Sequence, residues 1–124
     1  RAFLTAGLAV SVADFLHAQR VRAAIRREYA ELFGRVDLIL SPTLTAGDLP
    51  DGDGTPLFPL LGRFTLPAGL TGLPAIAFPC GFTTSGLPVG AQLLGPARTE
   101  PLLAAIVEVY QRETDWHTRM PPVC

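Results

Sequence analysis

The chain has 124 residues, of which 48% are hydrophobic and only 17% are charged, against roughly 25% charged residues in an ordinary globular domain. Its net charge of −1 gives no electrostatic reason to expect nucleic acid or an anionic membrane as a partner. A domain of this length buries only about two thirds of its unfolded surface. This surplus of apolar residues therefore predicts that some of them are buried against polypeptide outside these 124 residues. We expect this chain to be a piece of a longer protein. A homodimer interface is the other way in which the apolar residues could be buried.

The first predicted element is a long helix over about 11–33. The stretch "SVAD" places Ser11 three residues before Asp14, close to the capping-box arrangement. The apolar run "DLIL" then predicts a short buried strand at about 37–41, ending at Ser41-Pro42. Within the helix, apolar residues recur every three or four positions and predict one core-facing side: Ala18, Val21, Ile25, Tyr29, Leu32 and Val36.

A loop over 43–63 follows, with turn-forming residues and three aspartates between Gly47 and Gly54. The D-x-D-G pattern is similar to a calcium loop, but it lacks the downstream acidic ligand. No Asp or Glu follows Asp53 until Glu100. We therefore expect a solvated loop and no metal site.

The segment from Phe64 to Ala97 contains no charged residue and no histidine. Its prolines and glycines exclude a lipid-exposed helix, because they would leave backbone groups unpaired in hydrocarbon. After a short helix, two apolar strands are predicted at about 75–80 and 88–94, buried on both faces and joined by "TTSGL". Thr99 is expected to cap a last helix over about 99–114. The residues expected on the inner side of that helix are Leu102, Leu103, Ile106, Val109 and Tyr110.

Most of the side chains that carry enzyme chemistry are missing. All ten basic residues are arginine, so no mechanism with a lysine base can run on this chain alone. None of the three serines sits in a G-x-S-x-G elbow. They fit a helix cap, a strand end and a turn instead: Ser11, Ser41 and Ser85.

The histidines and cysteines fit structural roles better than catalytic ones. His17 lies beside the apolar stripe of the first helix, and His117 follows Trp116 just past the last helix. A lone histidine in such places is usually a hydrogen-bonded structural residue. Asp115 could form a dyad with His117, but no nucleophile is near in sequence. Cys80 has no charged neighbour and is expected to be a small buried hydrophobe. With Cys124 as the only other cysteine, no disulfide framework or metal spacing exists, and a reducing cytoplasm is expected.

The uncharged segment also carries the most specific pattern in the chain. "FTLPAGLTGLPAIAFPCGFTTSGLPVGAQLLG" closely resembles the C-terminal signature of the amidase signature family. That signature reads approximately F-T-x-P-x-N-L-x-G-L-P-A-I-S-V-P-C-G-F, a short turn, then G-L-P-V-G-L-Q-L-I-G. Three further stretches resemble family segments in the right order: "SVADFLHAQRVR", "VDLILSPT" and "ETDWHTRMPP". The resemblance implies the C-terminal part of the amidase signature fold, an α/β fold with a mixed β-sheet covered by helices.

The resemblance also implies an activity, the hydrolysis of a small carboxamide to a carboxylate and ammonia or an amine. In the family a Ser, cis-Ser, Lys triad carries this reaction without a cofactor. The Gly/Ser-rich motif that holds those serines is absent here, as is every lysine. The N-terminal part of the same enzyme would therefore supply catalysis. This chain would contribute one wall of the acyl pocket, with Thr43, Phe64 and Gly69 as substrate-side residues.

Two departures from the family pattern bear on the substrate. Gly69 replaces the common Asn of the N-L-x-G-L-P stretch, which removes a side chain able to tie that turn. Gly62 stands where the glutamyl-tRNA amidotransferase A subunit commonly carries an Asp that holds the amino group of glutamine. The uncharged residue favours a stand-alone amidase. The alternatives are a fragment of the amidotransferase subunit and a non-catalytic relic or interaction module.

Overall fold

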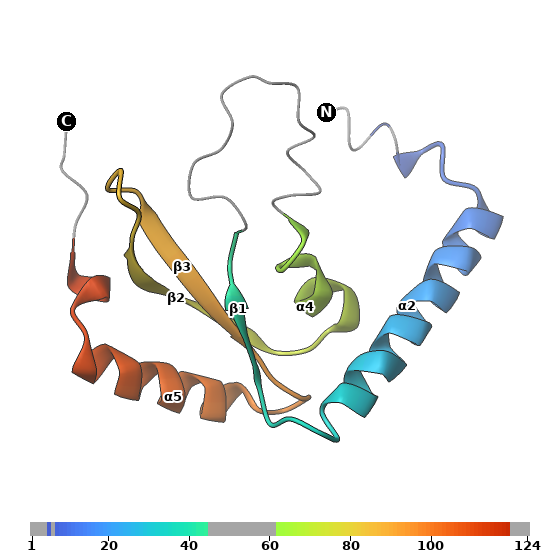
Figure 1. The fold of residues 1–124 in the computed structure, drawn as a ribbon. Coiled ribbons are helices and arrows are strands. Elements are labelled where there is room, and N and C mark those ends of the chain that lie inside the picture. The colour runs from blue at the N-terminus through green and yellow to red at the C-terminus, as the bar shows by residue number, and fades with distance from the viewer. Residues whose placement is uncertain (1–4, 6, 45–61, 120–124) are drawn as a thin grey trace.

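The computed structural model describes residue 5, residues 7–44 and residues 62–119. These residues form an α/β arrangement in which a small sheet lies between helices (Figure 1). The acidic stretch from Gly47 to Gly54 lies outside the described residues. In chain order the elements are α2 (Val12–Leu32), β1 (Ile39–Pro42), α4 (Leu66–Thr71), β2 (Ala75–Phe82), β3 (Pro88–Leu94), α5 (Glu100–Glu113) and a 3-10 helix, η1 (Trp116–Thr118).

The sheet has three strands in the order β1-β3-β2, and both pairs are antiparallel. Gln92 lies in the central strand, where it is opposite Ser41 on one side and Ala77 on the other. A register shift between Pro79 and Gly81 marks a bulge in β2. Any parallel pair of the mixed sheet implied by the resemblance would therefore need a strand other than these three.

Local backbone chemistry explains how the uncharged segment folds back on itself. Gly72 follows α4 with a φ of 73°, a left-handed conformation that ends the helix at little cost for a glycine. Gly86, with a φ of 87°, turns the β2–β3 hairpin. Thr83 closes that turn, because its hydroxyl accepts a 3.0 Å hydrogen bond from the backbone amide of Leu87.

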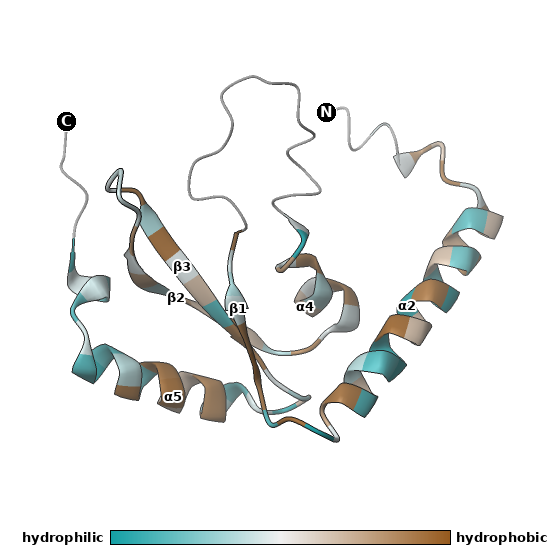
Figure 2. Ribbon diagram, viewed as in Figure 1, coloured by the Kyte–Doolittle hydropathy of each residue, from teal (hydrophilic) through white to brown (hydrophobic). Residues whose placement is uncertain are grey.

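The hydrophobic core lies between α5 and one face of the sheet. Phe78 and Leu93 from the strands pack with Leu103 and Val107 from the helix. Leu103 is only 2% exposed, whereas three residues expected on the inner side of this helix are exposed: Leu102, Ile106 and Val109. That expectation was wrong for these three residues, because a sheet of three strands covers only a narrow stripe of α5. Figure 2 shows apolar residues along much of this helix.

The two strands expected to be buried on both faces are covered mainly on one. Phe78 is buried towards α5, whereas Ala75 and Ala77 of the same strand are exposed. Successive side chains of a strand point to opposite faces, so these alanines mark the open face. In β3 the burial is more complete, because Gln92 and Leu94 are both buried.

The α2 helix begins as expected but does not bury the predicted side. Ser11 and Asp14 form the full capping box. No residue of the helix is buried, although Ile25 and Tyr29 are half-buried. The prediction of a core face was wrong for the described chain, because the main contact of α2 there is with the short α4 helix. The Arg22 Nε donates a 2.6 Å hydrogen bond to the Leu70 carbonyl there.

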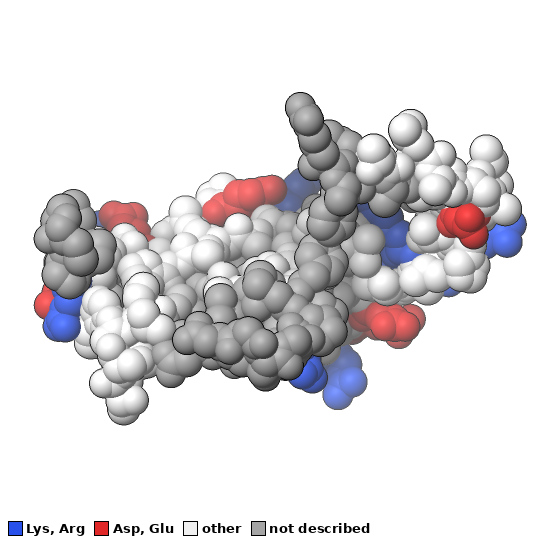
Figure 3. Space-filling view, turned by 90° about the horizontal axis from the view of Figure 1, so that it is seen from above, with Lys and Arg blue, Asp and Glu red and all other residues white. Residues whose placement is uncertain are grey.

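Charged side chains do not gather in one patch of a single sign on the face of the molecule seen in Figure 3. In the view from above, acidic and basic residues lie in separate small groups rather than in one patch of a single sign (Figure 3). A single-sign patch is the usual electrostatic signal of a nucleic-acid surface. Within residues 7–44 and 62–119, no helix is long and apolar enough to cross a membrane.

Candidate functional site

A buried polar cluster lies in the sheet on the face turned away from α5. Leu93 packs towards α5, so its neighbour Gln92 points to the other face. Gln92 is only 7% exposed, and Ser41 lies opposite it on β1. A buried amide is costly unless its hydrogen-bonding groups are paired.

The Gln92 side chain makes two hydrogen bonds that join three segments. Its Nε2 donates to the Ser41 Oγ at 3.1 Å and to the Phe64 carbonyl at 2.6 Å. Ser41 belongs to β1, Gln92 to β3, and Phe64 to the turn that leads into α4. The amide therefore holds that turn against the end of β1.

Thr43 lies at the end of β1, two residues beyond Ser41. Its backbone amide donates a 2.9 Å hydrogen bond to the carbonyl of Gly90. Its Oγ1 is buried and has no hydrogen-bond partner among the described residues. A buried hydroxyl without a partner costs about 1–3 kcal/mol, so this atom is suited to a group that the described residues do not provide.

Glycine at position 90 makes the place of Thr43 possible. A Cβ added at Gly90 would lie 2.7 Å from the Thr43 Oγ1, closer than real Cβ contacts. The hydroxyl thus occupies the space that a side chain on β3 would fill. This explains in steric terms why the strand has glycine there.

The expected substrate-side residues divide into two groups. Thr43 binds Gly90 of β3 through its backbone amide, and the Phe64 carbonyl binds Gln92 of the same strand. Gly69 lies in α4 and is exposed, and a Cβ there would meet nothing within 4 Å. Gly62 is buried, and a Cβ there would lie 2.5 Å from the Leu66 Cδ1. The structure thus brings Thr43 and Phe64 towards one site and leaves Gly69 outside it.

The remaining nucleophile and base candidates are engaged elsewhere. Ser11 caps α2, and the Ser85 Oγ lies 2.8 Å from the Thr83 hydroxyl in the hairpin turn. Cys80 is a free, half-buried thiol whose Sγ lies 3.5 Å from the Val89 carbonyl. Among the described residues, no group of three or more His, Cys, Asp or Glu side chains could hold a metal ion.

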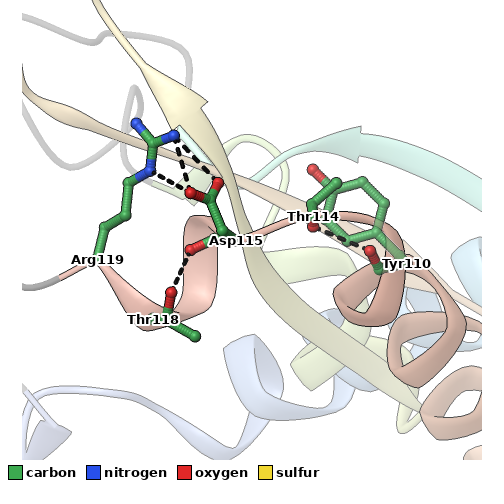
Figure 4. A network of polar contacts seen from close by, with 5 residues as sticks. All are labelled: Tyr110, Thr114, Asp115, Thr118 and Arg119. Carbon is green, nitrogen blue, oxygen red and sulfur yellow. Dashed lines mark hydrogen bonds and ion pairs between the residues drawn. The ribbon is translucent and has the colours of Figure 1, made fainter.

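Asp115 binds an arginine in this structure. Its carboxylate accepts a hydrogen bond from the Arg119 Nε at 3.2 Å and two from Nη2 at 3.0 and 3.1 Å (Figure 4). The Arg119 guanidinium also lies 4.3 Å from the centre of the Trp116 ring, which in turn stacks at a tilt on Phe82 of β2. This network fastens η1 to the end of the hairpin. We assign it a structural role.

An apolar hollow lies on the opposite face of the sheet from the polar cluster, the face that α5 covers. It has a volume of about 630 Å³ and lies between β1 and α5. Ser41 and Gly90 belong to its lining, together with apolar residues such as Leu40 and Tyr110. Leu40 is 66% exposed, so this part of the sheet is open in the described chain.

Sequence reasoning missed Gln92 and assigned Ser41 only to a strand end. One signal was available, because Gln92 is the only polar side chain in "PVGAQLL". A polar residue inside an apolar strand predicts a buried hydrogen-bond partner. The pattern could not show which partner, since Ser41 lies 51 residues and Phe64 lies 28 residues away in sequence.

Comparison with known proteins shows which family the chain belongs to. Residues 3–104 match the family described as Amidase. The A subunit of the glutamyl-tRNA(Gln) amidotransferase of Roseiflexus sp. (strain RS-1) is 47% identical over 112 residues, which are 88% of this chain and 23% of that protein.

Two solved structures show the same similarity. The A subunit of the glutamyl-tRNA(Gln) amidotransferase from Thermotoga maritima has 36% identity and a TM-score of 0.63, over 82% of this chain and 23% of its own. A crystal structure described as an amidase has 27% identity and a TM-score of 0.79, over 89% of this chain and 27% of its own. The chain thus spans about a quarter of the length of these relatives. On the match of residues 3–104, the chain belongs to the Amidase family.

Proposed function

We propose that this chain is the C-terminal portion of an amidase that hydrolyses a carboxamide to a carboxylate and ammonia or an amine. In this proposal the chain forms one wall of the acyl pocket. The catalytic Ser, cis-Ser and Lys come from the rest of the enzyme, its main partner. We use the term complete enzyme for that longer polypeptide.

The observation that carries the proposal is the Thr43 hydroxyl, which is buried and has no partner within the described part of the chain. It lies at the end of a strand, where open α/β sheets usually bind ligands. A hydroxyl can both donate and accept a hydrogen bond, so it can bind the oxygen or the nitrogen of an amide.

The catalytic residues are assigned to the rest of the enzyme because this chain lacks the residues that the reaction needs. It has no lysine, and its serines serve as a cap, a sheet partner and a turn residue. We therefore expect no hydrolysis by the chain alone. The free thiol of Cys80 suits a reducing, cytoplasmic setting.

Two enzyme classes fit the proposal, and they differ in the substrate. The named relatives include subunits of a glutamyl-tRNA(Gln) amidotransferase, which supports that class for this chain. The uncharged, buried Gly62 supports a stand-alone amidase, because a buried ammonium left unpaired costs several kcal/mol. The Leu66 side chain fills the space beside Gly62 and makes this part of the wall apolar.

Substrate preference in the complete enzyme separates these classes. We expect a higher kcat/KM for propionamide than for glutamine in the parent. Gly62→Asp should shift the ratio towards glutamine, in a Leu66→Ala background that makes room for the new side chain. Gly62→Ala in the same background is the control for volume without charge. A parent that strongly prefers glutamine would favour the amidotransferase class instead.

Thr43→Val tests the pocket wall itself. Valine keeps the shape of threonine and removes the hydroxyl, so folding should be preserved. We expect kcat/KM for the amide to fall by about 10-fold, the loss of roughly 1.4 kcal/mol from one hydrogen bond in the transition state. An unchanged kcat/KM would remove Thr43 from the pocket. A complete enzyme that hydrolyses no amide would favour a non-catalytic relic or interaction module.

A further inference from the structure

The Gln92 side chain bonds both β1 and the turn before α4. Its two hydrogen bonds reach a hydroxyl on one segment and a backbone carbonyl on the other. The residue is 7% exposed, so water cannot easily replace either bond. The position of Phe64 relative to the end of β1 therefore depends on this one amide.

Hydrogen-bond chemistry fixes the orientation of that amide. The Phe64 carbonyl can only accept a hydrogen bond, so the atom 2.6 Å from it must be the amide nitrogen. The same nitrogen has a second hydrogen, and the Ser41 Oγ accepts it. The site uses both hydrogens of one NH₂ group, which neither a carboxylate nor an apolar side chain can supply.

The two hydrogen bonds of Gln92 also affect the positions of the residues next to the polar cluster. Thr43 follows Ser41 by two residues, just beyond the end of β1. Its Oγ1 lies where a side chain at Gly90 would point, and Gly90 shares a face of β3 with Gln92. Gly62 precedes Phe64 by two residues in the turn, with Leu66 against it. A shift of the turn away from β1 would therefore change the distance between the Thr43 hydroxyl and the residues around Gly62.

We propose that Gln92 is a positioning residue of the acyl pocket. This proposal rests on the proposed amidase function and deepens it. Gln92 touches no reacting atom. It holds the turn of residues 62–65 at a fixed distance from Ser41 and Thr43, and that distance sets which acyl chains fit. A displacement of about 1 Å in a positioning element can cost on the order of 100-fold in rate.

The test compares two adjacent residues of β3 in the complete enzyme. Gln92→Met has a similar volume but no donors, so it releases the turn from the face that carries Thr43. Leu93→Ala creates a cavity on the α5 side and serves as the matched control for lost stability. Ser41→Ala is a milder variant, because Gln92 keeps its bond to the Phe64 carbonyl. Each variant is assayed with propionamide and hexanamide, and its Tm is measured.

We expect Gln92→Met to lower kcat/KM for propionamide by about 10-fold or more and to change the propionamide to hexanamide ratio. Ser41→Ala should change that ratio in the same direction and by less. Leu93→Ala should lower the Tm and leave the ratio unchanged. A ratio that moves equally in Gln92→Met and Leu93→Ala would reduce Gln92 to a general stabilising residue.

Failure of this proposal is distinct from failure of the proposed function. An enzyme that hydrolyses both amides and keeps its ratio in Gln92→Met overturns only the positioning role. If Gln92→Met does not fold, an unchanged ratio in Ser41→Ala overturns the role by itself. A parent without turnover of either amide overturns the function on which the role rests.

Discussion

Replacement of Gly90 by alanine gives the sharpest test of the geometry at the end of β1. Away from tight contacts, Gly→Ala in a compatible conformation stabilises a protein by about 0.4–1 kcal/mol, because it restricts the unfolded chain. At Gly90 the new Cβ would lie 2.7 Å from the Thr43 Oγ1 and 3.5 Å from its Cβ. Threonine is stiff at χ1, so it cannot move the hydroxyl away freely. This contact should therefore decide whether Gly90→Ala stabilises or destabilises the protein.

The magnitude follows from these opposing effects. Overpacking of this kind costs about 1–3 kcal/mol, and the gain from the unfolded state offsets about 0.4–1 kcal/mol. We therefore expect Gly90→Ala to destabilise the complete enzyme by about 0.5–2 kcal/mol. Thr43→Ala removes the Oγ1 and leaves ordinary contacts of 3.5 Å with the Cβ of residue 43 and 3.8 Å with the Phe78 carbonyl, so the double variant should recover most of the loss.

Urea unfolding of the parent, both single variants and the double variant measures this coupling. The double-mutant cycle should give an interaction energy of about 1 kcal/mol or more, since the two residues share a contact. A Gly90→Ala variant as stable as the parent would refute the reasoning. Strict additivity of the two substitutions would refute it as well, because the Thr43 hydroxyl would then not lie over Gly90.

Three further predictions concern the sheet, the core and the C-terminal network. Ile76→Asp should lower the Tm of the complete enzyme far more than Glu108→Ala, because an unpaired carboxylate in a sheet costs several kcal/mol; equal shifts would mean that Ile76 is exposed there. Leu103→Ala should cost about 2–5 kcal/mol in urea unfolding, as expected for a large fully buried residue, and a loss well below that range would place Leu103 outside the core. Arg119→Lys should lower the Tm slightly by weakening the fork to Asp115 and the ring contact, each worth about 0.5–1 kcal/mol; a Tm equal to that of the parent would mean that neither contact contributes.

Local chemistry made much of the fold predictable. The Ser11 cap and the uncharged hairpin are signalled by adjacent residues, and they appear at α2 and at β2–β3. Thr99 was expected to cap α5 in the same way. It does precede the helix, but its hydroxyl donates to the Pro96 carbonyl at 2.7 Å and caps no helix amide. Two roles compete locally for one hydroxyl, and the sequence pattern does not show which one wins.

Burial and the candidate site depend on contacts between distant segments. The periodicity of α2 predicted a core side, but Val21 and Leu32 of that side remain 46% and 37% exposed in this chain. Periodicity shows which side of a helix is apolar enough to face a core. It cannot show whether the segment that packs against that side belongs to these 124 residues. Gln92 illustrates the same limit, because both of its partners come from segments that fold onto β3 from far away in the chain.

Amide hydrolysis by the purified chain itself tests the central claim most directly, that these residues form a pocket wall and contain no catalytic group. The assay measures ammonia release from a set of small amides, with light scattering on the same sample to report its association state. We predict no release above background, and an associated sample, because apolar surfaces such as that of Leu40 remain uncovered. Two results together would contradict the account: turnover by a monodisperse monomer, and loss of that turnover in Ser41→Ala. They would place the nucleophile within this chain.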